Sequence, residues 1–103
     1  MGAYVALLLV HLRFPDAQSL KAKRKDLQSV KAQLHGRHGL TVAEVDHQDV
    51  WQRATLAAAL TGGSPSGLEA AVDRVENWLE SRFPESVRIE RVMRSFEEAG
   101  ELR

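Results

Sequence analysis

An almost unbroken run of apolar residues opens the chain, from Tyr4 to Phe14. A run of this length that is rich in valine and leucine favours a β-strand buried on both faces over an amphipathic helix. Pro15 and Asp16 come directly after it and interrupt regular pairing. The sequence therefore predicts a first strand over residues 4–14.

Two later segments carry apolar residues at helical spacing. The first can be capped by Asp16 or Ser19 and ends near Gly36 and Gly39; its apolar residues are Leu20, Leu27, Val30 and Leu34. The second begins at Ser64-Pro65, with Ser64 or Ser66 as its cap, and ends at Pro84. Its apolar stripe comprises Leu68, Ala71, Val72, Val75, Trp78, Leu79 and Phe83. Two helices are predicted.

Three further strands are predicted from alternation and from the glycines that end them. Residues 40–46 alternate in polarity. Residues 53–61 are rich in alanine and could form a helix, but Gly62-Gly63 ends them abruptly, which favours a strand. Residues 87–93 form the last strand, and their alternation slips near Arg91, which indicates a bulge or the end of core pairing.

The predicted order is strand–helix–strand–strand–helix–strand, which is the ferredoxin-like βαββαβ arrangement. We expect an α/β (α+β) fold in a single domain over residues 1–103, with a four-stranded antiparallel sheet and two helices on one face. The charged tail, about residues 95–103, is expected to fray.

The first strand would be apolar on both faces, but two helices can cover only one. Exposed apolar surfaces of this kind mark interfaces, so we expect a homodimer or a higher homo-oligomer. The alternative is a monomer whose own tail covers this face. In the ferredoxin-like arrangement the first and third strands lie in the middle of the sheet. They carry aliphatic residues and alanines, with Tyr4 and Phe14 only at the ends of the first. Base stacking on the sheet, as RNA-recognition modules use it, is therefore not expected.

Composition adds few constraints. Among 103 residues, 14 basic and 14 acidic residues balance, and the absence of cysteine excludes disulfides and thiol chemistry. The longest apolar run is about ten residues, half of what a membrane-spanning helix needs, and it has no basic flank typical of a signal peptide. We expect a cytoplasmic protein that does not contact membranes.

Basic residues gather in the first helix, where five of them form a candidate RNA- or phosphate-binding surface: Lys21, Lys23, Arg24, Lys25 and Lys31. Phosphate backbones bind such surfaces with an affinity that falls as salt rises. The alternatives are a solvated helix face or pairing with the acidic second helix, within one molecule or across a dimer.

A second cluster lies between the second and third predicted strands and comprises Glu44, Asp46, His47, Asp49, Trp51 and Arg53. Carboxylates beside a histidine suit a hard cation or general-base catalysis. Neighbouring residues of a strand point to opposite faces, however, so Asp46 and His47 can share a ligand only if the chain turns there. We favour a turn with a polar network, in which Arg53 pairs with Glu44 or Asp46. His35 and His38 make a weak two-ligand metal site at most. No catalytic, metal-binding or cofactor-binding residue and no cofactor is assigned.

Two segments carry a resemblance to a known family. PDAQSLKAKR at residues 15–24 and AEVDHQDVWQRA at residues 43–54 resemble the PDAxSLKxKR and AEVDHQDLWQRA segments of the YlxP-like family of small bacterial proteins, with Val50 in place of a common leucine. The resemblance runs from about Tyr4 to Met93, and it is weaker at the turn over residues 62–67 and in the tail. It implies a ferredoxin-like fold and no established activity. Its gene neighbourhood, near translation initiation factor two and ribosome-binding factor A, implies a link to translation or ribosome maturation.

Together these observations favour a non-enzymatic binding or assembly protein that contacts RNA or a ribosomal subunit. Two alternatives remain. One is a small metal-dependent or acid/base hydrolase that uses Asp46, His47 and Asp49. The other is a dimer that senses a small ligand.

Overall fold

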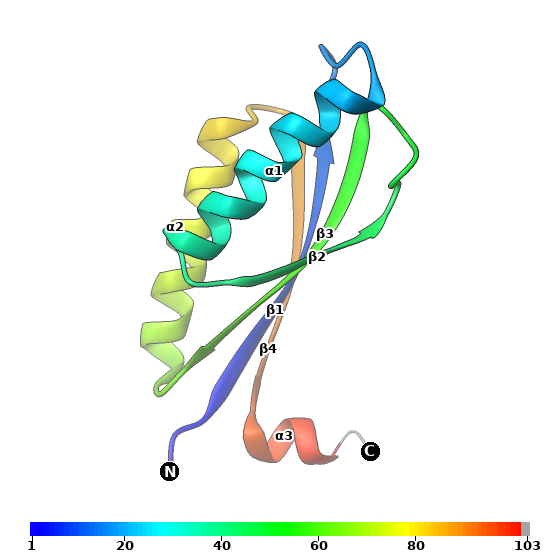
Figure 1. Ribbon diagram of the computed structural model, residues 1–103. Coiled ribbons are helices and arrows are strands. Elements are labelled where there is room, and N and C mark those ends of the chain that lie inside the picture. The colour runs from blue at the N-terminus through cyan, green and yellow to red at the C-terminus, as the bar shows by residue number, and fades with distance from the viewer. Residues whose placement is uncertain (102–103) are drawn as a thin grey trace.

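Seven elements make up the computed structural model, which describes residues 1–101 (Figure 1). They are β1 (Tyr4–Arg13), α1 (Leu20–Gly36), β2 (Thr41–Asp46), β3 (Arg53–Gly62), α2 (Pro65–Arg82), β4 (Val87–Ser95) and α3 (Phe96–Glu101). The predicted order of strands and helices is confirmed over residues 4–95. The prediction of two helices is wrong, because residues 96–101 form a third one, α3. The fraying of the tail stays a prediction, and its last residues, 102–103, lie outside the described residues. Ser95 caps α3, because its hydroxyl accepts a hydrogen bond from the Glu98 amide at 3.1 Å.

The four strands form one antiparallel sheet in the order β2-β3-β1-β4. β1 lies between β3 and β4 and pairs with β3 along its whole length, from Tyr4 opposite Gly62 to Arg13 opposite Arg53. This continuous pairing explains why the alanine-rich segment is a strand: ten registered residues outweigh its weak helical preference. The chain therefore has an α+β fold whose central strands are β1 and β3, as predicted.

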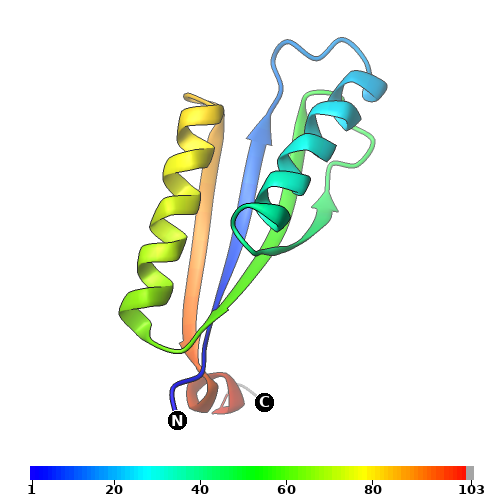
Figure 2. The ribbon, with the colours of Figure 1, turned by 60° about the vertical axis from the view of Figure 1, so that its left-hand side comes forward.

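Both long helices cover the same face of the sheet (Figures 1 and 2). Each begins at a serine whose hydroxyl accepts an amide hydrogen bond, Ser19 from Ala22 at 3.0 Å and Ser64 from Gly67 at 3.1 Å. Their buried residues pack on alternate residues of the central strands. The core residues of these four elements are Ala6, Leu8, Val10 and Leu12 of β1, Leu27, Val30 and Leu34 of α1, Ala54, Leu56 and Ala58 of β3, and Leu68, Val72, Val75 and Leu79 of α2.

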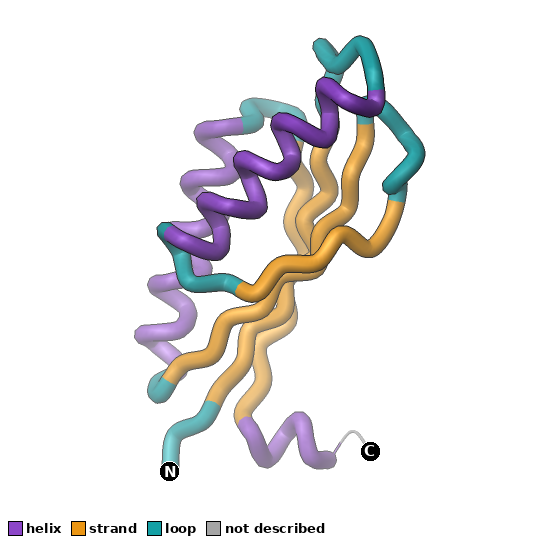
Figure 3. Tube along the Cα trace, in the orientation of Figure 1, coloured by secondary structure: helices purple, strands orange, loops and turns teal. Residues whose placement is uncertain are grey.

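The other face of the sheet, which we call the open face, is not covered by α1 or α2; α3 lies only at its end, where Phe96 and Ala99 line a cavity with Val5 and Thr61 (Figure 3). Leu7 lies between its register partners Ala59 of β3 and Val92 of β4. The exposed fraction is 49% for Leu7, 37% for Leu9 and 47% for Val92. An apolar centre on the open face is thus present, as the two-sided first strand predicted.

The predicted irregularity near Arg91 is wrong. β4 pairs with β1 without interruption from Val87 to Ser95, and Arg91 lies on the helix-covered face opposite Leu8. The irregularity lies elsewhere, between Glu44 and Asp46 of β2, where the register with β3 shifts. Within residues 1–101, no helix is both long and apolar enough to cross a membrane.

Candidate functional site

The connection between β2 and β3 is a tight turn at one end of the sheet. His47 adopts a left-handed backbone conformation with φ of 63°, which is uncommon for residues other than glycine. The Asp46 carboxylate accepts a hydrogen bond from the His47 amide at 2.8 Å, and the Val50 amide donates to the His47 carbonyl at 3.1 Å. The turn predicted for this segment is confirmed.

Lys23 of α1 reaches into this turn and fixes it. Its side chain has no exposed surface. The Nζ atom donates to the carbonyls of His47 at 2.9 Å, Arg53 at 3.1 Å and Gln48 at 3.4 Å. A buried ammonium is tolerated only with such partners. The expectation that Lys23 contributes to the basic surface is therefore wrong, because its charge is enclosed within the protein.

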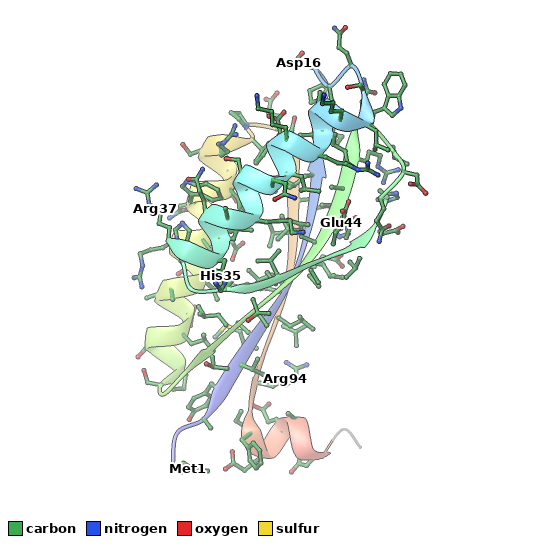
Figure 4. The ribbon with its side chains drawn as sticks, in the orientation of Figure 1. Met1, Asp16, His35, Arg37, Glu44 and Arg94 are labelled. Atoms are coloured by element: carbon green, nitrogen blue, oxygen red, sulfur yellow. The ribbon has the colours of Figure 1, made fainter. Side chains whose placement is uncertain are left out.

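Glu44 completes the environment of this lysine. One of its carboxylate oxygens, Oε2, lies 3.6 Å from the Lys23 Nζ, within ion-pair distance but too far for a hydrogen bond, and accepts no hydrogen bond from any other described group. Figure 4 shows Glu44 on β2, in the part of the strand that leads into the turn. The predicted polar network is present here, but its centre is Lys23 and not Arg53.

The other members of the predicted polar cluster do not converge on one point. Asp46 and His47 lie 3.7 Å apart at their closest side-chain atoms, whereas Asp49 and Trp51 are exposed, Trp51 by 52%. No group of three or more acidic or histidine side chains in residues 1–101 could hold a metal ion. The expected pairing of Arg53 with Glu44 or Asp46 is wrong, since those two carboxylates lie against Lys23 and His47.

The exposed basic surface consists of Lys21, Arg24, Lys25 and the half-buried Lys31. Within the described chain, none of these four cations forms an ion pair with a carboxylate. Asp26 is the only acidic residue in α1. This surface therefore keeps its positive charge.

Three of the four acidic residues of α2 are engaged by a different partner. Arg91 of β4 lies 2.6 Å from the Glu76 carboxylate, 2.9 Å from that of Asp73 and 3.9 Å from that of Glu69. The hydrogen bond to Asp73 and the nearby charge of Glu76 raise the pKa of Arg91 above its usual value. The intramolecular pairing of α1 with α2, one of the sequence-based alternatives, is therefore not observed.

Near the C-terminal end of α1, the two histidines point to different partners. The His35 Nδ1 lies 3.1 Å from the Leu40 carbonyl, while the His38 ring packs on Trp78 of α2 with centroids 5.4 Å apart. Burial, followed by the charges of Arg37 and Arg74, lowers the pKa of His38. Figure 4 shows His35 and Arg37 at this end of the helix, far from the turn that contains His47. The His38–Trp78 contact joins the segment after α1 to α2.

Comparison with known proteins gives a family and no activity. A model of the family described as "Protein of unknown function (DUF503)" matches residues 5–96. The uncharacterized protein YlxP of Bacillus subtilis (strain 168) is 33% identical over 70 residues, which cover 68% of this chain and 75% of that protein. Among solved structures, the de novo designed protein Foldit4 superposes with a TM-score of 0.54 over 89% of this chain and 96% of its own, at 10% identity. That similarity concerns the fold alone.

Proposed function

Because the chain belongs to the DUF503 family, whose function is unknown, we propose a function from the chemistry of its own surface: it is a non-enzymatic binding or assembly protein that contacts RNA through α1. The observation that carries this proposal is the unpaired positive surface of Lys21, Arg24, Lys25 and Lys31. The resemblance to the YlxP-like family makes ribosomal RNA the first partner to test.

The spacing of these residues supports a role other than folding. Lys21, Arg24 and Lys25 lie within one turn of α1, and like charges three and four residues apart destabilise a helix. An RNA backbone would neutralise all three, with release of its counterions. Phosphate contacts of this kind would give affinity without sequence preference.

The test compares two double charge reversals in RNA binding. Lys21→Glu with Lys25→Glu should weaken binding to ribosomal subunits and to structured RNA, and should lower the slope of log K against log salt by roughly one per lysine. Arg74→Glu with Arg82→Glu, on α2, changes the net charge equally and should have a much smaller effect. Equal losses in the two variants, or no binding by the wild type at low salt, would contradict the proposal.

We further propose that two copies associate through the open face. Glu90 and Arg94 lie on this face of β4, on either side of Val92; Figure 4 shows Arg94 on the side of the sheet away from the helices. A two-fold axis near Val92 would bring Glu90 of each copy close to Arg94 of the other, as an isologous interface requires.

Sedimentation velocity tests this association. Val92→Asp should give a monomer. Glu90→Arg and Arg94→Glu should each weaken the dimer, and the two changes combined should restore it. A wild type that stays monomeric at the highest attainable concentration would refute the interface.

We also propose a finer classification of the fold. The βαββαβ order with β1 and β3 central supports a ferredoxin-like arrangement, to which α3 is added. An RNA-binding role would place the protein in the cytoplasm, and a fold without cysteine does not depend on an oxidising compartment.

A further inference from the structure

Arginine residues meet at one end of the open face, where folding alone gives no reason for them. Arg13 of β1 lies directly opposite Arg53 of β3 in the sheet register. In the next row, His11 lies between Thr55 of β3 and Arg88 of β4. Like charges placed opposite each other destabilise strand pairing.

Few carboxylates compensate these cations. The Arg13 guanidinium donates to a backbone carbonyl, that of Glu85, at 3.0 Å. Arg53 takes part in no ion pair within residues 1–101. Arg88 lies 3.6 Å from the Glu90 carboxylate, which also contacts the His11 Nε2 at 2.7 Å. Of these three guanidinium groups, only that of Arg88 has a carboxylate within ion-pair distance among the described residues, so the cluster carries an excess of positive charge.

These side chains surround a cavity of about 370 Å³, which is within the usual size range of small-ligand sites. Its wall includes His11, Arg13, His47, Arg53, Glu85 and Arg88. The turn after β2 thus contributes His47 and the first residue of β3 contributes Arg53, two residues singled out from the sequence for their chemistry. The buried Lys23 holds the backbone of both in place, because it binds their carbonyls.

An independent feature marks the same place. Within the described residues, only two residues other than glycine have a positive φ, His47 at 63° and Glu85 at 60°. They come from turns that are far apart in sequence, and both line this cavity. Uncommon backbone conformations of this kind persist where surrounding structure enforces them, and they gather at binding sites.

We propose that this cavity binds a phosphomonoester group, held by the guanidinium forks of Arg13 and Arg53 with Arg88 beside them. The planar guanidinium matches two oxygens of a phosphate at once, which a lysine cannot do. Such a ligand would remove the repulsion between the opposed arginines. The site lies on the open face, apart from the helix surface proposed for RNA, and it does not depend on that proposal.

The test is an NMR titration of ¹⁵N-labelled protein with inorganic phosphate, with chloride added to keep the ionic strength constant. We expect saturable shifts of the backbone amides of Arg53, Thr55 and Ser86. Arg53→Ala should weaken phosphate binding at least tenfold. Arg53→Lys keeps the charge but loses the planar guanidinium fork, so its affinity for phosphate should lie between those of Arg53→Ala and the wild type. Arg74→Ala removes an equal charge from α2 and serves as the control. A linear, unsaturated response in the wild type, or equal weakening by Arg53→Ala and Arg74→Ala, would overturn the proposal.

Two further arms identify the source of the phosphate and separate this site from the RNA surface. Tighter binding of AMP than of inorganic phosphate would identify a nucleoside monophosphate, and preference for a 5′-phosphorylated over a 5′-hydroxyl RNA oligonucleotide would identify an RNA end. The Lys21→Glu, Lys25→Glu variant should retain phosphate binding in the cavity. Its loss of RNA binding would then be due to the surface of α1 alone. If that variant also lost phosphate binding, the cavity would not be a separate site, and this proposal would fail.

Discussion

Leu7 and Leu8 are neighbours on β1, yet their surroundings differ completely. Leu8 is 1% exposed beneath the helices, whereas Leu7 is 49% exposed on the open face. The cations at the end of the sheet differ in the same way: Lys23 is enclosed by three carbonyls, while Arg53 is exposed beside another arginine. The helix-covered face buries its apolar residues, whereas the open face exposes leucines and places like charges opposite each other, so the open face is where selection for binding is expected.

The largest effect on stability should come from a change at the buried Lys23. Lys23→Met keeps the aliphatic stem but leaves three carbonyls and Glu44 without their partner, so we expect a loss of about 3–5 kcal/mol in the free energy of unfolding. Lys21→Met, on the exposed side of the same helix, should change stability by about 0.5 kcal/mol or less. Urea denaturation measures both. A Lys23→Met variant as stable as the wild type would mean that these contacts only offset the cost of burying the charge.

The two leucines give the next comparison. Leu8→Ala should cost about 2–5 kcal/mol, because it opens a cavity in the core. Leu7→Ala removes a side chain that is half exposed in one copy and should cost about 1 kcal/mol at low protein concentration. A cost for Leu7→Ala that grows with protein concentration would indicate that a second copy covers this residue.

A smaller effect, a gain in stability, is expected at the cross-strand pair of Arg13 and Arg53. Arg53→Glu replaces a repulsive cross-strand pair with an attractive one, so it should stabilise the fold by about 0.2–1 kcal/mol. In an Arg13→Ala background, Arg53→Glu should give no gain in stability. A double-mutant cycle measured by thermal denaturation isolates the interaction energy between the two positions. Destabilisation by Arg53→Glu would show that the two guanidinium groups do not repel each other.

The smallest effect concerns pH. The pKa of His38 is lowered from 6.5 in the folded protein, chiefly because partial burial removes water from its ring, so the unfolded chain binds more protons when the pH falls below 6.5. Its contribution to stability is therefore present above about pH 6.5 and is lost as the pH falls toward the folded pKa. The urea midpoint should fall more between about pH 7.5 and about pH 5.5 for the wild type than for His38→Phe. An equal fall in both would assign the pH dependence to other groups.

The element order could be predicted because apolar spacing and the residues that end each element are local signals. The irregularity placed at Arg91 could not be resolved in that way. Val92 and Met93 are both apolar because one belongs to the open face and the other packs on the core, while Arg91 occupies a core-side position that the α2 carboxylates make tolerable. Apolar patterns fail to show a strand's register wherever both of its faces carry apolar residues.

The burial of Lys23 had a signal that the sequence interpretation missed. Lys23, Leu27, Val30 and Leu34 share the spacing of one helical stripe, so the lysine stands where a core residue is expected. The arginine cavity had no such signal. Arg13, Arg53 and Arg88 are far apart in sequence and meet only through the register of three strands, which single-sequence patterns do not provide.

The position of Lys23 also has a consequence for the order of folding. Its three acceptors lie 24, 25 and 30 residues further along the chain, so the ammonium cannot lose its water until β2, the turn and the start of β3 are in place. Lys23 should therefore contribute little in the transition state. The lysine would then act mainly on the lifetime of the native state, because contacts that form late slow unfolding and leave the folding rate nearly unchanged.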